Sequence, residues 1–385
     1  MRFLMQLLVL TLSWSPVGLA KYHFLTVTDI HYGAENQAMD GQDTGPVLFK
    51  EMLKEFSILS KQADFIIHLG DMPTHSFFNY SAKEDYERVV FHGLFAANSA
   101  KKPIFYITGN NDSLTGNYQP FQYEHKSPLN FANDWTGSCA YCDGLMVDKT
   151  YMRSGGFYSS YVMPGNKEIL LIALNTIPWS TRPILLPKYP NQEADAEREF
   201  VWLEQQLKKH SAKQLLIAMH IPPGKSYKNN LFWQEQYLNR FITLLQQNHQ
   251  AYQEITLLTA HTHMDELRVL HLKEGANIYA YSTPAVSRIH YNNPGMKLFS
   301  LNNEMAITNY ITFYTSSFKK WANEHYQAIG NTSAIFPSCQ THTLALCFNS
   351  LTAKEVCADL EDKFYYGAKS SRVAAHVCRF TYEIN

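Results

Sequence analysis

The amino-acid sequence predicts an α/β fold, and two features of its 385 residues point to it. Hydrophobic residues make up 45% of the chain and charged residues 17%, which is the composition of a globular protein with a large core. Short apolar runs typical of buried strands alternate with longer stretches of helical period. The 33 Lys and Arg nearly balance the 34 Asp and Glu, which argues against a broad basic surface and a nucleic-acid polymer as partner.

The first element is an N-terminal targeting segment. Arg2 precedes the apolar stretch 3–12, and Gly18-Leu19-Ala20 supplies the small residues of a signal-peptide cleavage site. A membrane anchor is the alternative, but Pro16 breaks the run short of the about 20 apolar residues that span a bilayer. We therefore predict removal of residues 1–20 and an exported protein without stable membrane insertion. It would be secreted or periplasmic, or lysosomal or extracellular in a eukaryote.

Strands and helices follow in alternation. Six apolar runs are predicted to be strands: Phe24–Val27, Phe65–Leu69, Ile104–Thr108, Ile169–Leu174, Leu215–Met219 and Ile255–Thr259. Helical patterns occupy about 46–61, 82–100, 193–210 and 232–248. Apolar strands separated by helices imply a sheet that is covered on both faces. We expect one large domain over residues 21–315 and a small, mainly helical, cysteine-containing subdomain over 316–385.

The six cysteines fall into two groups. Cys139 and Cys142 form a Cys-x-x-Cys pair with no second such pair to complete a zinc ribbon. In an exported protein we prefer a local disulfide there to a metal or redox site. The four late cysteines are predicted to form two bridges in the C-terminal subdomain; they are Cys339, Cys347, Cys357 and Cys378.

Polar residues directly follow five of the predicted strands. Singly each has a structural interpretation, because an Asp can cap a helix and Asp or Asn after Gly is common in turns. In an open α/β sheet, however, loops at the strand ends converge in one crevice. The joint occurrence predicts a metal site formed by Asp29, His31, Asp71, Asn110, His220, His261 and His263.

The donor types of this set define its chemistry. Imidazole nitrogen and carboxylate oxygen without thiolate suit Zn²⁺ best, with Mn²⁺ or Fe as alternatives. Seven ligands are too many for one tetrahedral ion, whereas a shared carboxylate lets them hold two. Two ions about 3.5–4 Å apart activate a water and stabilise an in-line displacement at phosphorus. The predicted reaction class is metal-assisted phosphoester hydrolysis.

The ordered set Asp29-x-His31, Gly70-Asp71, Gly109-Asn110-Asn111-Asp112, His220 and His261-x-His263 resembles the calcineurin-like metallophosphoesterases. The resemblance covers about residues 22–300. It implies a four-layer α/β/β/α sandwich with a dinuclear centre. By the family pattern, Asp71 bridges the two metals. The first would be held by Asp29, His31 and His263, and the second by Asn110, His220 and His261.

Finer features resemble the acid-sphingomyelinase-like phosphodiesterases. Asp71-Met72-Pro73-Thr74-His75 looks like the Asp-x-Pro-x-His of that branch, and Asn292-Asn293-Pro294-Gly295 is similar to a later motif. Acid sphingomyelinase carries a lipid-gripping saposin domain before its catalytic region. We expect none here, because the predicted catalytic region follows the signal peptide directly. This favours soluble phosphoesters such as nucleotides over membrane sphingomyelin.

One position departs from the family pattern. Asn111 stands where the family usually has a His that contacts the phosphate and helps to protonate the leaving group. An amide donates hydrogen bonds but supplies no proton. Our hypothesis is that His75 is the general acid and that Asn111 and His75 contact the substrate. The structural alternative for His75 is an outer ligand or a helix cap. His125 is a further candidate for the substrate cleft.

The sequence thus predicts an exported, monomeric, dinuclear-metal phosphodiesterase acting on nucleotides or similar small phosphoesters. Two enzyme alternatives use the same metals: an acid phosphatase or polyphosphatase, and a sphingomyelin phosphodiesterase. From a different class comes a secreted, non-catalytic binding module. All seven predicted ligands are present, which argues against that last interpretation, because inert relatives of enzymes usually lose ligands.

Overall fold

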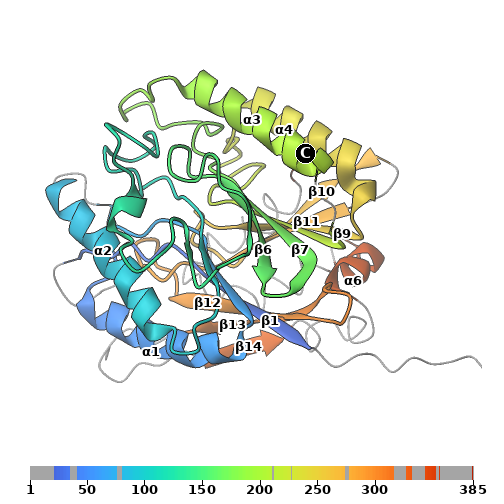
Figure 1. Ribbon diagram of the computed structural model, residues 1–385, viewed down its shortest axis with the longest axis horizontal. Coiled ribbons are helices and arrows are strands. Elements are labelled where there is room, and N and C mark those ends of the chain that lie inside the picture. The colour runs from blue at the N-terminus through green and yellow to red at the C-terminus, as the bar shows by residue number, and fades with distance from the viewer. Residues whose placement is uncertain are drawn as a thin grey trace, which may run out of the picture.

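Two seven-stranded sheets pack face to face in the computed structural model, with helices on their outer sides (Figure 1). This is the four-layer α/β/β/α sandwich that the resemblance implies. The structure describes residues 21–34, 41–75, 80–209, 212–226, 228–273, 277–315, 327–331, 343–352, 355 and 384. The predicted signal peptide and most of the predicted C-terminal subdomain lie outside these residues.

The first sheet has the order β14-β13-β12-β1-β2-β3-β4. Strands β1, β2 and β3 are parallel, and the outer strands pair antiparallel. Phe24 at the centre of β1 stacks between Phe65 and Phe299, with ring centroids 4.9 and 4.5 Å away. The strands are Tyr22–Val27 (β1), Phe65–His68 (β2), Ile104–Tyr106 (β3), Cys139–Ala140 (β4), Gly295–Leu301 (β12), Ile307–Tyr314 (β13) and Gln327–Asn331 (β14).

The second sheet has the order β10-β11-β9-β8-β7-β6-β5. Its centre, from β7 through β8 and β9 to β11, is parallel, and both edges are antiparallel. The strands are Met146–Asp148 (β5), Tyr158–Met163 (β6), Asn166–Ala173 (β7), Gln214–Ala218 (β8), Glu254–Thr259 (β9), Leu267–His271 (β10) and Asn277–Ser282 (β11). Each sheet therefore has a parallel centre whose strands end at one edge.

Four long helices cover the two outer faces. Helices α1 (Pro46–Gln62) and α2 (Tyr80–Ala97) cover the first sheet, and α3 (Gln192–Lys209) and α4 (Glu235–Asn248) cover the second (Figure 1). On α3 the buried side includes Phe200, Leu203 and Leu207, the residues expected from the helical period. The short elements are η1 (Pro128–Phe131), η2 (His249–Ala251) and α6 (Leu344–Ser350).

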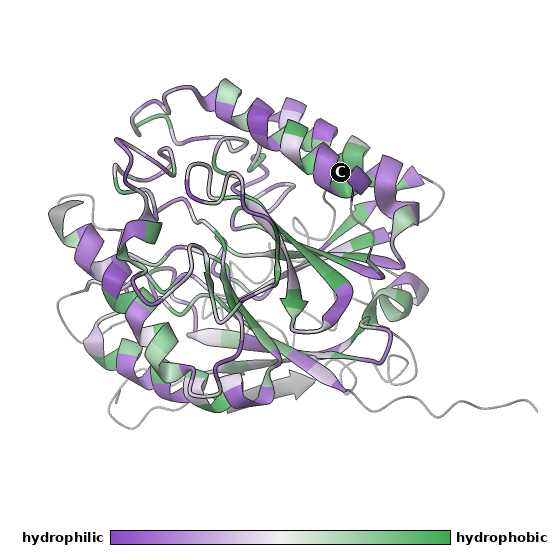
Figure 2. Cartoon of the chain, in the orientation of Figure 1, coloured by the Kyte–Doolittle hydropathy of each residue, from purple (hydrophilic) through white to green (hydrophobic). Residues whose placement is uncertain are grey.

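The central strands are apolar on both sides because both sides are covered. Ile169 and Leu171 on β7 belong to the core between the two sheets. Leu170 and Ile172 on the same strand pack in the core beneath α3 and α4. Figure 2 shows hydrophobic colour along much of the central strands, with hydrophilic colour at several strand ends and in bands along the helices.

All six predicted strands and four predicted helices are present, but the strands form two sheets rather than the one that alternation implied. Each sheet is covered by helices on one face and by the other sheet on the second face, so the burial pattern is the same. Beyond residue 315, the described β14 pairs with β13, and α6 packs on β11 and β13. The domain boundary at 315/316 stays a prediction.

The predicted local disulfide between Cys139 and Cys142 is present. Cys347 is also disulfide-bonded; Cys339, Cys357 and Cys378, and with them the pairing of the late cysteines, lie outside the described residues. Among the helices of the described chain, we find none with the length and apolar character needed to cross a membrane.

Candidate metal centre

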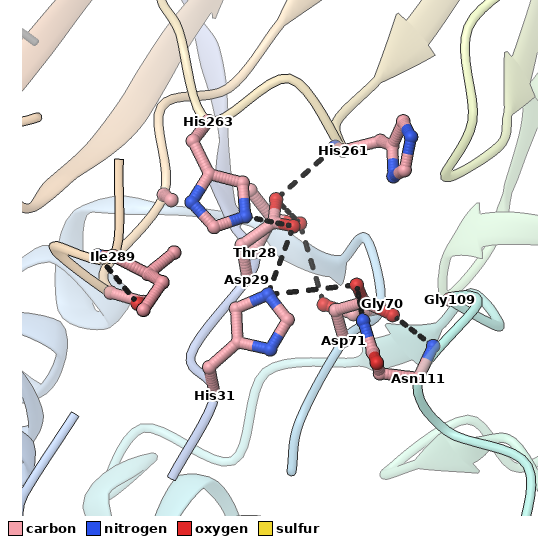
Figure 3. Close-up of polar contacts among 12 residues, drawn as sticks. Thr28, Asp29, His31, Gly70, Asp71, Gly109, Asn111, His261, His263 and Ile289 are labelled. Atoms are coloured by element: carbon pink, nitrogen blue, oxygen red, sulfur yellow. Dashed lines mark hydrogen bonds and ion pairs between the residues drawn. The ribbon is translucent and has the colours of Figure 1, made fainter. Parts of the chain in front are cut away.

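All seven predicted ligands lie at the carboxyl ends of parallel strands, where the two sheets meet. Asp29 and His31 follow β1, Asp71 follows β2, and Asn110 follows β3. From the second sheet, His220 follows β8, and His261 and His263 follow β9. Figure 3 shows Asp29, Asp71, His31 and His263 pointing toward one another. The crevice at the strand ends is therefore the place where the ligands converge, as predicted.

Five of the seven predicted ligands have a left-handed backbone, with φ of 46° at Asp29, 46° at His31, 57° at Asp71, 71° at His261 and 64° at His263. Such values are uncommon for residues other than glycine, and each costs of the order of 1–3 kcal/mol. They turn the chain sharply just after each strand. In this way two ligands separated by one residue both reach the same cluster.

Two carboxylates form the centre of the cluster. Nε2 of His31 lies 3.5 Å from Oδ1 of Asp29 and 3.5 Å from Oδ2 of Asp71. Nε2 of His220 lies 3.1 Å from the same Asp71 oxygen, and Nε2 of His263 lies 3.3 Å from the same Asp29 oxygen. Nitrogen atoms from three loops thus surround one pair of oxygen atoms.

Backbone carbonyls fix the orientation of two of these imidazoles. Nδ1 of His31 is 3.0 Å from the oxygen of Pro73, and Nδ1 of His220 is 2.7 Å from the oxygen of Leu69. A carbonyl only accepts, so each Nδ1 carries the hydrogen and each Nε2 is left as a lone-pair donor facing the carboxylates. This is how metal-binding histidines are usually oriented.

Several buried atoms of the cluster lack a hydrogen-bond partner among the described residues: Oδ1 of Asp29, Nε2 of His31, Nε2 of His220 and Oδ1 of Asn110. Nδ2 of Asn110 donates to Oδ1 of Asn117 at 2.7 Å, so the amide oxygen of Asn110 is the atom available to bind a metal. A buried polar atom without a partner is costly. Divalent cations would satisfy these atoms, and the residues present therefore fit a metal centre.

The ligand atoms group as two neighbouring sites require. Asp29, His31 and Asp71 form one set within 4.8 Å, and Asp71, His220 and His261 form another. Asp71 is common to both, as expected of a bridging ligand.

The electrostatics of the cluster favour positive charge. Burial opposes protonation of His31 and His220, but the carboxylates of Asp29 and Asp71 outweigh it and raise the pKa of both imidazoles to about 9. Burial together with the neighbouring His220 lowers the pKa of His261 to about 3. A cluster that attracts protons against burial is also one that attracts metal cations.

Asp112 ties the loops of two ligands together. Its carboxylate accepts hydrogen bonds from the backbone nitrogens of Asp71 (3.0 Å), Met72 (2.8 Å) and Gly109 (2.7 Å), and from the hydroxyl of Tyr106 (2.7 Å). The sequence motif contains Asp112, but its role could not be read from the motif. The side chain fixes the left-handed turn at Asp71 relative to the loop that carries Asn110.

The predicted general acid His75 lies beside the cluster. Its ring stacks on that of His31 with centroids 3.8 Å apart, and its Nδ1 is 3.0 Å from Oδ1 of Asp43. His290 lies 4.5 Å from His263 and 6.4 Å from His75 between ring centroids. Asp43 and His290 were not identified from the sequence, since neither directly follows a predicted strand.

The other predicted residues occupy different positions. Asn111 lies next to Asp71 and donates to both of its carboxylate oxygens, from its backbone nitrogen at 2.7 Å and from Nδ2 at 2.8 Å (Figure 3). Tyr118, which is not one of the predicted ligands, places its hydroxyl 3.3 Å from Nε2 of His261. His125 is exposed on a tight turn, and none of the contacts found among the described residues joins it to the cluster. Its role at the substrate stays a prediction.

Sequence relatives support the predicted branch. A sphingomyelinase phosphodiesterase D of Dictyostelium discoideum is 26% identical over 294 residues, which cover 72% of this chain and 61% of the relative. A sphingomyelin phosphodiesterase 2 of Caenorhabditis elegans is 24% identical over 276 residues, covering 66% of this chain and 41% of the relative. The chain thus spans about two fifths to three fifths of the length of these relatives.

Fold and family comparisons agree with the site. The crystal structure of a dimetal phosphatase from Danio rerio superposes with a TM-score of 0.50 at 13% identity, over 76% of this chain and 95% of that protein. At this identity the likeness concerns the fold alone. A sequence profile described as calcineurin-like phosphoesterase matches residues 22–265. With more than half of its length matched, the chain belongs to the calcineurin-like phosphoesterase family of metal-dependent phosphoric ester hydrolases.

Proposed function

We propose that the protein is an exported phosphodiesterase that uses two divalent metal ions to hydrolyse nucleotides or similar small phosphodiesters. The observation that carries this proposal is the convergence of the two ligand sets on the shared carboxylate of Asp71. Export is supported by the Cys139–Cys142 disulfide and by the signal-peptide pattern. N-terminal sequencing of the exported protein tests it, with Lys21 expected as the first residue.

In this proposal Asp29, His31 and His263 hold one metal, and Asn110, His220 and His261 hold the other. The carboxylate of Asp71, which belongs to both groups of ligand atoms, would contribute to both sites. The oxygen and nitrogen donors suit zinc first, with manganese or iron as alternatives. When bound, the two ions supply an activated water and neutralise charge on the phosphoryl group.

The chain's own residues would do the rest. Nδ2 of Asn111 uses one of its two hydrogens for Asp71, which leaves the other for a phosphoryl oxygen. His75 has a partly exposed side chain (27%) beside the buried ligands, and its Nε2 can give a proton to the leaving oxygen. The product alcohol and phosphomonoester then leave through the open side of the crevice.

A cavity beside the metal ligands favours a diester over a monoester. It has a volume of about 280 Å³ and is lined by His261, Phe232, Met264, Ile289 and Tyr291, among others. A phosphomonoester has one ester group, whereas a diester needs space for a second. The cavity supplies this space next to the metal-binding His261.

The positive charge of the one arginine that lines the cavity, Arg268, is compensated by Glu266. Arg268 is fully buried, and its Nε and Nη2 donate to Oε2 of Glu266 at 3.1 and 2.8 Å. Its Nη1 donates to the backbone oxygens of Pro223 and Lys225. These bonds use four of the five N–H groups of Arg268, and Glu266 compensates its charge, so Arg268 attracts a second phosphate less than an unpaired arginine would. An uncharged ester group is the better occupant, which disfavours polyphosphate.

A sphingomyelin phosphodiesterase is the second candidate, because the curated relatives carry that name and aromatic rings such as Phe232 and Tyr291 suit a choline group. An acid phosphatase or polyphosphatase and a non-catalytic binding module are further alternatives. We regard the protein as a monomer in solution, and size-exclusion chromatography with light scattering tests this.

The deciding experiment measures hydrolysis of bis-nitrophenyl phosphate, nitrophenyl phosphate, ATP, polyphosphate and sphingomyelin, with metal content assayed on the same sample. We expect two ions per chain and faster turnover of the diester. Turnover confined to monoesters or polyphosphate would assign a phosphatase, and preference for sphingomyelin vesicles would assign the second candidate. No turnover with two bound ions would favour the binding module.

A further inference from the structure

We infer that Asp43 is a positioning residue for His75: its carboxylate fixes the imidazole so that Nε2 is the nitrogen presented to the leaving oxygen. This inference rests on the proposed function. Asp43 lies just before α1, outside the sequence motifs of the site, and nothing in the sequence pattern assigns it a role.

The carboxylate of Asp43 is held from three sides. Oδ2 accepts hydrogen bonds from Oγ1 of Thr74 (2.7 Å) and from the backbone nitrogen of His75 (2.8 Å). Oδ1 accepts from Oγ of Ser287 (3.0 Å) and lies 3.0 Å from Nδ1 of His75. The donors come from the loops after β2 and β11 and the acceptor from the segment before α1. Both oxygens are therefore fixed in place.

This arrangement sets the hydrogen on the imidazole ring. An ionised carboxylate only accepts hydrogen bonds, so Nδ1 of His75 must be the donor to Asp43. The remaining nitrogen, Nε2, is then the one available to the site. Asp43 is itself only 7% exposed in its side chain, whereas that of His75 is 27% exposed. The buried acid thus holds the inner edge of a ring whose outer edge meets the crevice.

The position of His75 fits a group that acts on substrate. Its ring stacks on His31 at 3.8 Å and lies 5.9 Å from His263 between centroids, so it borders the first ligand set. His31 and His263, in contrast, have side chains that are 0% and 2% exposed. A proton donor needs access to the leaving oxygen, and a ligand needs none. The alternative is that Asp43 orients His75 as an additional metal ligand, since its nitrogen lies within 4.8 Å of theirs.

The proposed hydrolysis exchanges one bond at phosphorus and delivers one proton to the leaving oxygen. Water provides the oxygen of the new bond to phosphorus, the bond to the leaving oxygen breaks, and that oxygen takes the proton from Nε2 of His75. The proton released by the attacking water passes to solvent, and His75 regains one from solvent at its exposed edge. The hydrogen on Nδ1 of His75 stays on that nitrogen, hydrogen-bonded to Asp43, throughout the reaction. This bond keeps the ring in one orientation from one turnover to the next.

The test compares two diesters that share the retained group and differ in the leaving group, one nitrophenyl and one alkyl. Nitrophenolate leaves without a proton, whereas an alkoxide requires one. We expect Asp43→Asn to lower kcat for the alkyl ester by about 100-fold and for the nitrophenyl ester by less than about 3-fold. In a His75→Ala background, Asp43→Asn should have no further effect on this selectivity, because a positioning residue acts only through its partner.

Two readouts besides activity complete the test. The ¹⁵N spectrum of His75 should show hydrogen on Nδ1 in the parent protein and lose this signature in Asp43→Asn. Metal content should stay at the parent value. Asp134→Asn is the matched control, since Oδ2 of Asp134 lies 2.9 Å from Nδ1 of His92 in an exposed pair on the surface. It should change none of these measurements.

The outcomes separate the two proposals. Equal slowing of both esters by Asp43→Asn, or the same effect with and without His75, would overturn the positioning role while leaving the phosphodiesterase function standing. Loss of bound metal in Asp43→Asn would overturn it in favour of His75 as a ligand. Absence of hydrolase activity in the parent protein would instead remove the proposed function itself.

Discussion

Asn111 holds the carboxylate of Asp71 through two hydrogen bonds, from its backbone nitrogen to Oδ1 at 2.7 Å and from Nδ2 to Oδ2 at 2.8 Å. The variant Asn111→Ala removes only the second. Groups that orient a metal ligand in this way change metal affinity by about 10–100-fold. We expect a loss of that size in Asn111→Ala, measured by competition with a chelator. Unchanged affinity would mean that the backbone bond alone orients Asp71.

Removal of the metals should destabilise the fold. Asp29 and Asp71 are buried, and five ligands have left-handed backbones, so the site holds unfavourable charge and conformation that bound cations offset. A ligand present at 100 times its Kd stabilises a protein by about 2.7 kcal/mol. We expect a chelator to lower Tm by several degrees, and added zinc to restore it. The Asp71→Asn variant, which loses the bridging charge, should respond much less to either treatment.

Asp112 offers a graded test of stability. Asp112→Ala leaves the backbone nitrogens of Asp71, Met72 and Gly109 without their acceptor, and each unsatisfied buried donor costs about 1–3 kcal/mol. Tyr106→Phe removes one donor and leaves the other bonds intact, at about 1 kcal/mol. Urea unfolding should therefore show a loss at least twice as large for Asp112→Ala. Equal losses would contradict the role of Asp112 as a tie between the loops.

The cavity beside His261 makes a prediction about substrate selectivity. Phe232→Ala removes an aromatic wall of this cavity, so KM should rise about tenfold for bis-nitrophenyl phosphate and stay constant for nitrophenyl phosphate. Phe131→Ala is a matched control. Both rings have an arginine 5.3 Å from their centroids, Arg268 at Phe232 and Arg88 at Phe131, but Phe131 does not line the cavity. A parallel rise for the monoester would show that the cavity does not hold the second ester group.

Glu254 at the start of β9 predicts a pH dependence of stability. Burial raises the pKa of Glu254 to about 7, against a hydrogen bond from Thr256 that lowers it. The folded state then retains a proton that the unfolded chain releases above its ordinary pKa. The stability contribution is complete below about pH 4.5 and is lost as the pH rises through 7. Glu254→Gln should raise Tm at pH 8 and leave it unchanged at pH 4; a gain that is the same at both pH values would argue against titration of Glu254.

The part of the fold that could be predicted from sequence is the parallel centre of each sheet. Those strands are buried on both faces, so they are continuous apolar runs such as Ile169–Leu174. The antiparallel strands carry mixed patterns. Strand β12 contains Lys297, which is fully buried because its Nζ donates to the oxygen of Ser282 at 2.7 Å and pairs with Asp265. From sequence alone, a lysine within a strand predicts a solvent-exposed position. Only the tertiary structure shows the partners that allow Lys297 to be buried.

The residues proposed to hold the metals could be picked out from sequence because each directly follows a recognisable strand. The residues that orient the side chains of the site could not. Asp43 reaches His75 only through tertiary structure, across 32 positions of sequence, and Ser287 reaches Asp43 across 244. Asp112 lies inside a recognised motif, yet its acceptor role depends on the turn at Asp71. The orientation of a side chain in the site is thus a property of packing between loops, which a local sequence pattern does not record.

The placement of β1 in the sheet affects how the protein folds during its synthesis. Tyr22 at the start of β1 pairs with Leu301 at the end of β12, and β1 forms the middle of the first sheet. A nascent chain emerging from the ribosome therefore carries β1 with one side unpaired until nearly the whole catalytic region has been synthesised. The contact between Asp29 and His263 likewise cannot form until residue 263 has been synthesised. Completion of this sheet is therefore a late event in synthesis, and under the proposed export the chain would cross the membrane before the sheet is complete.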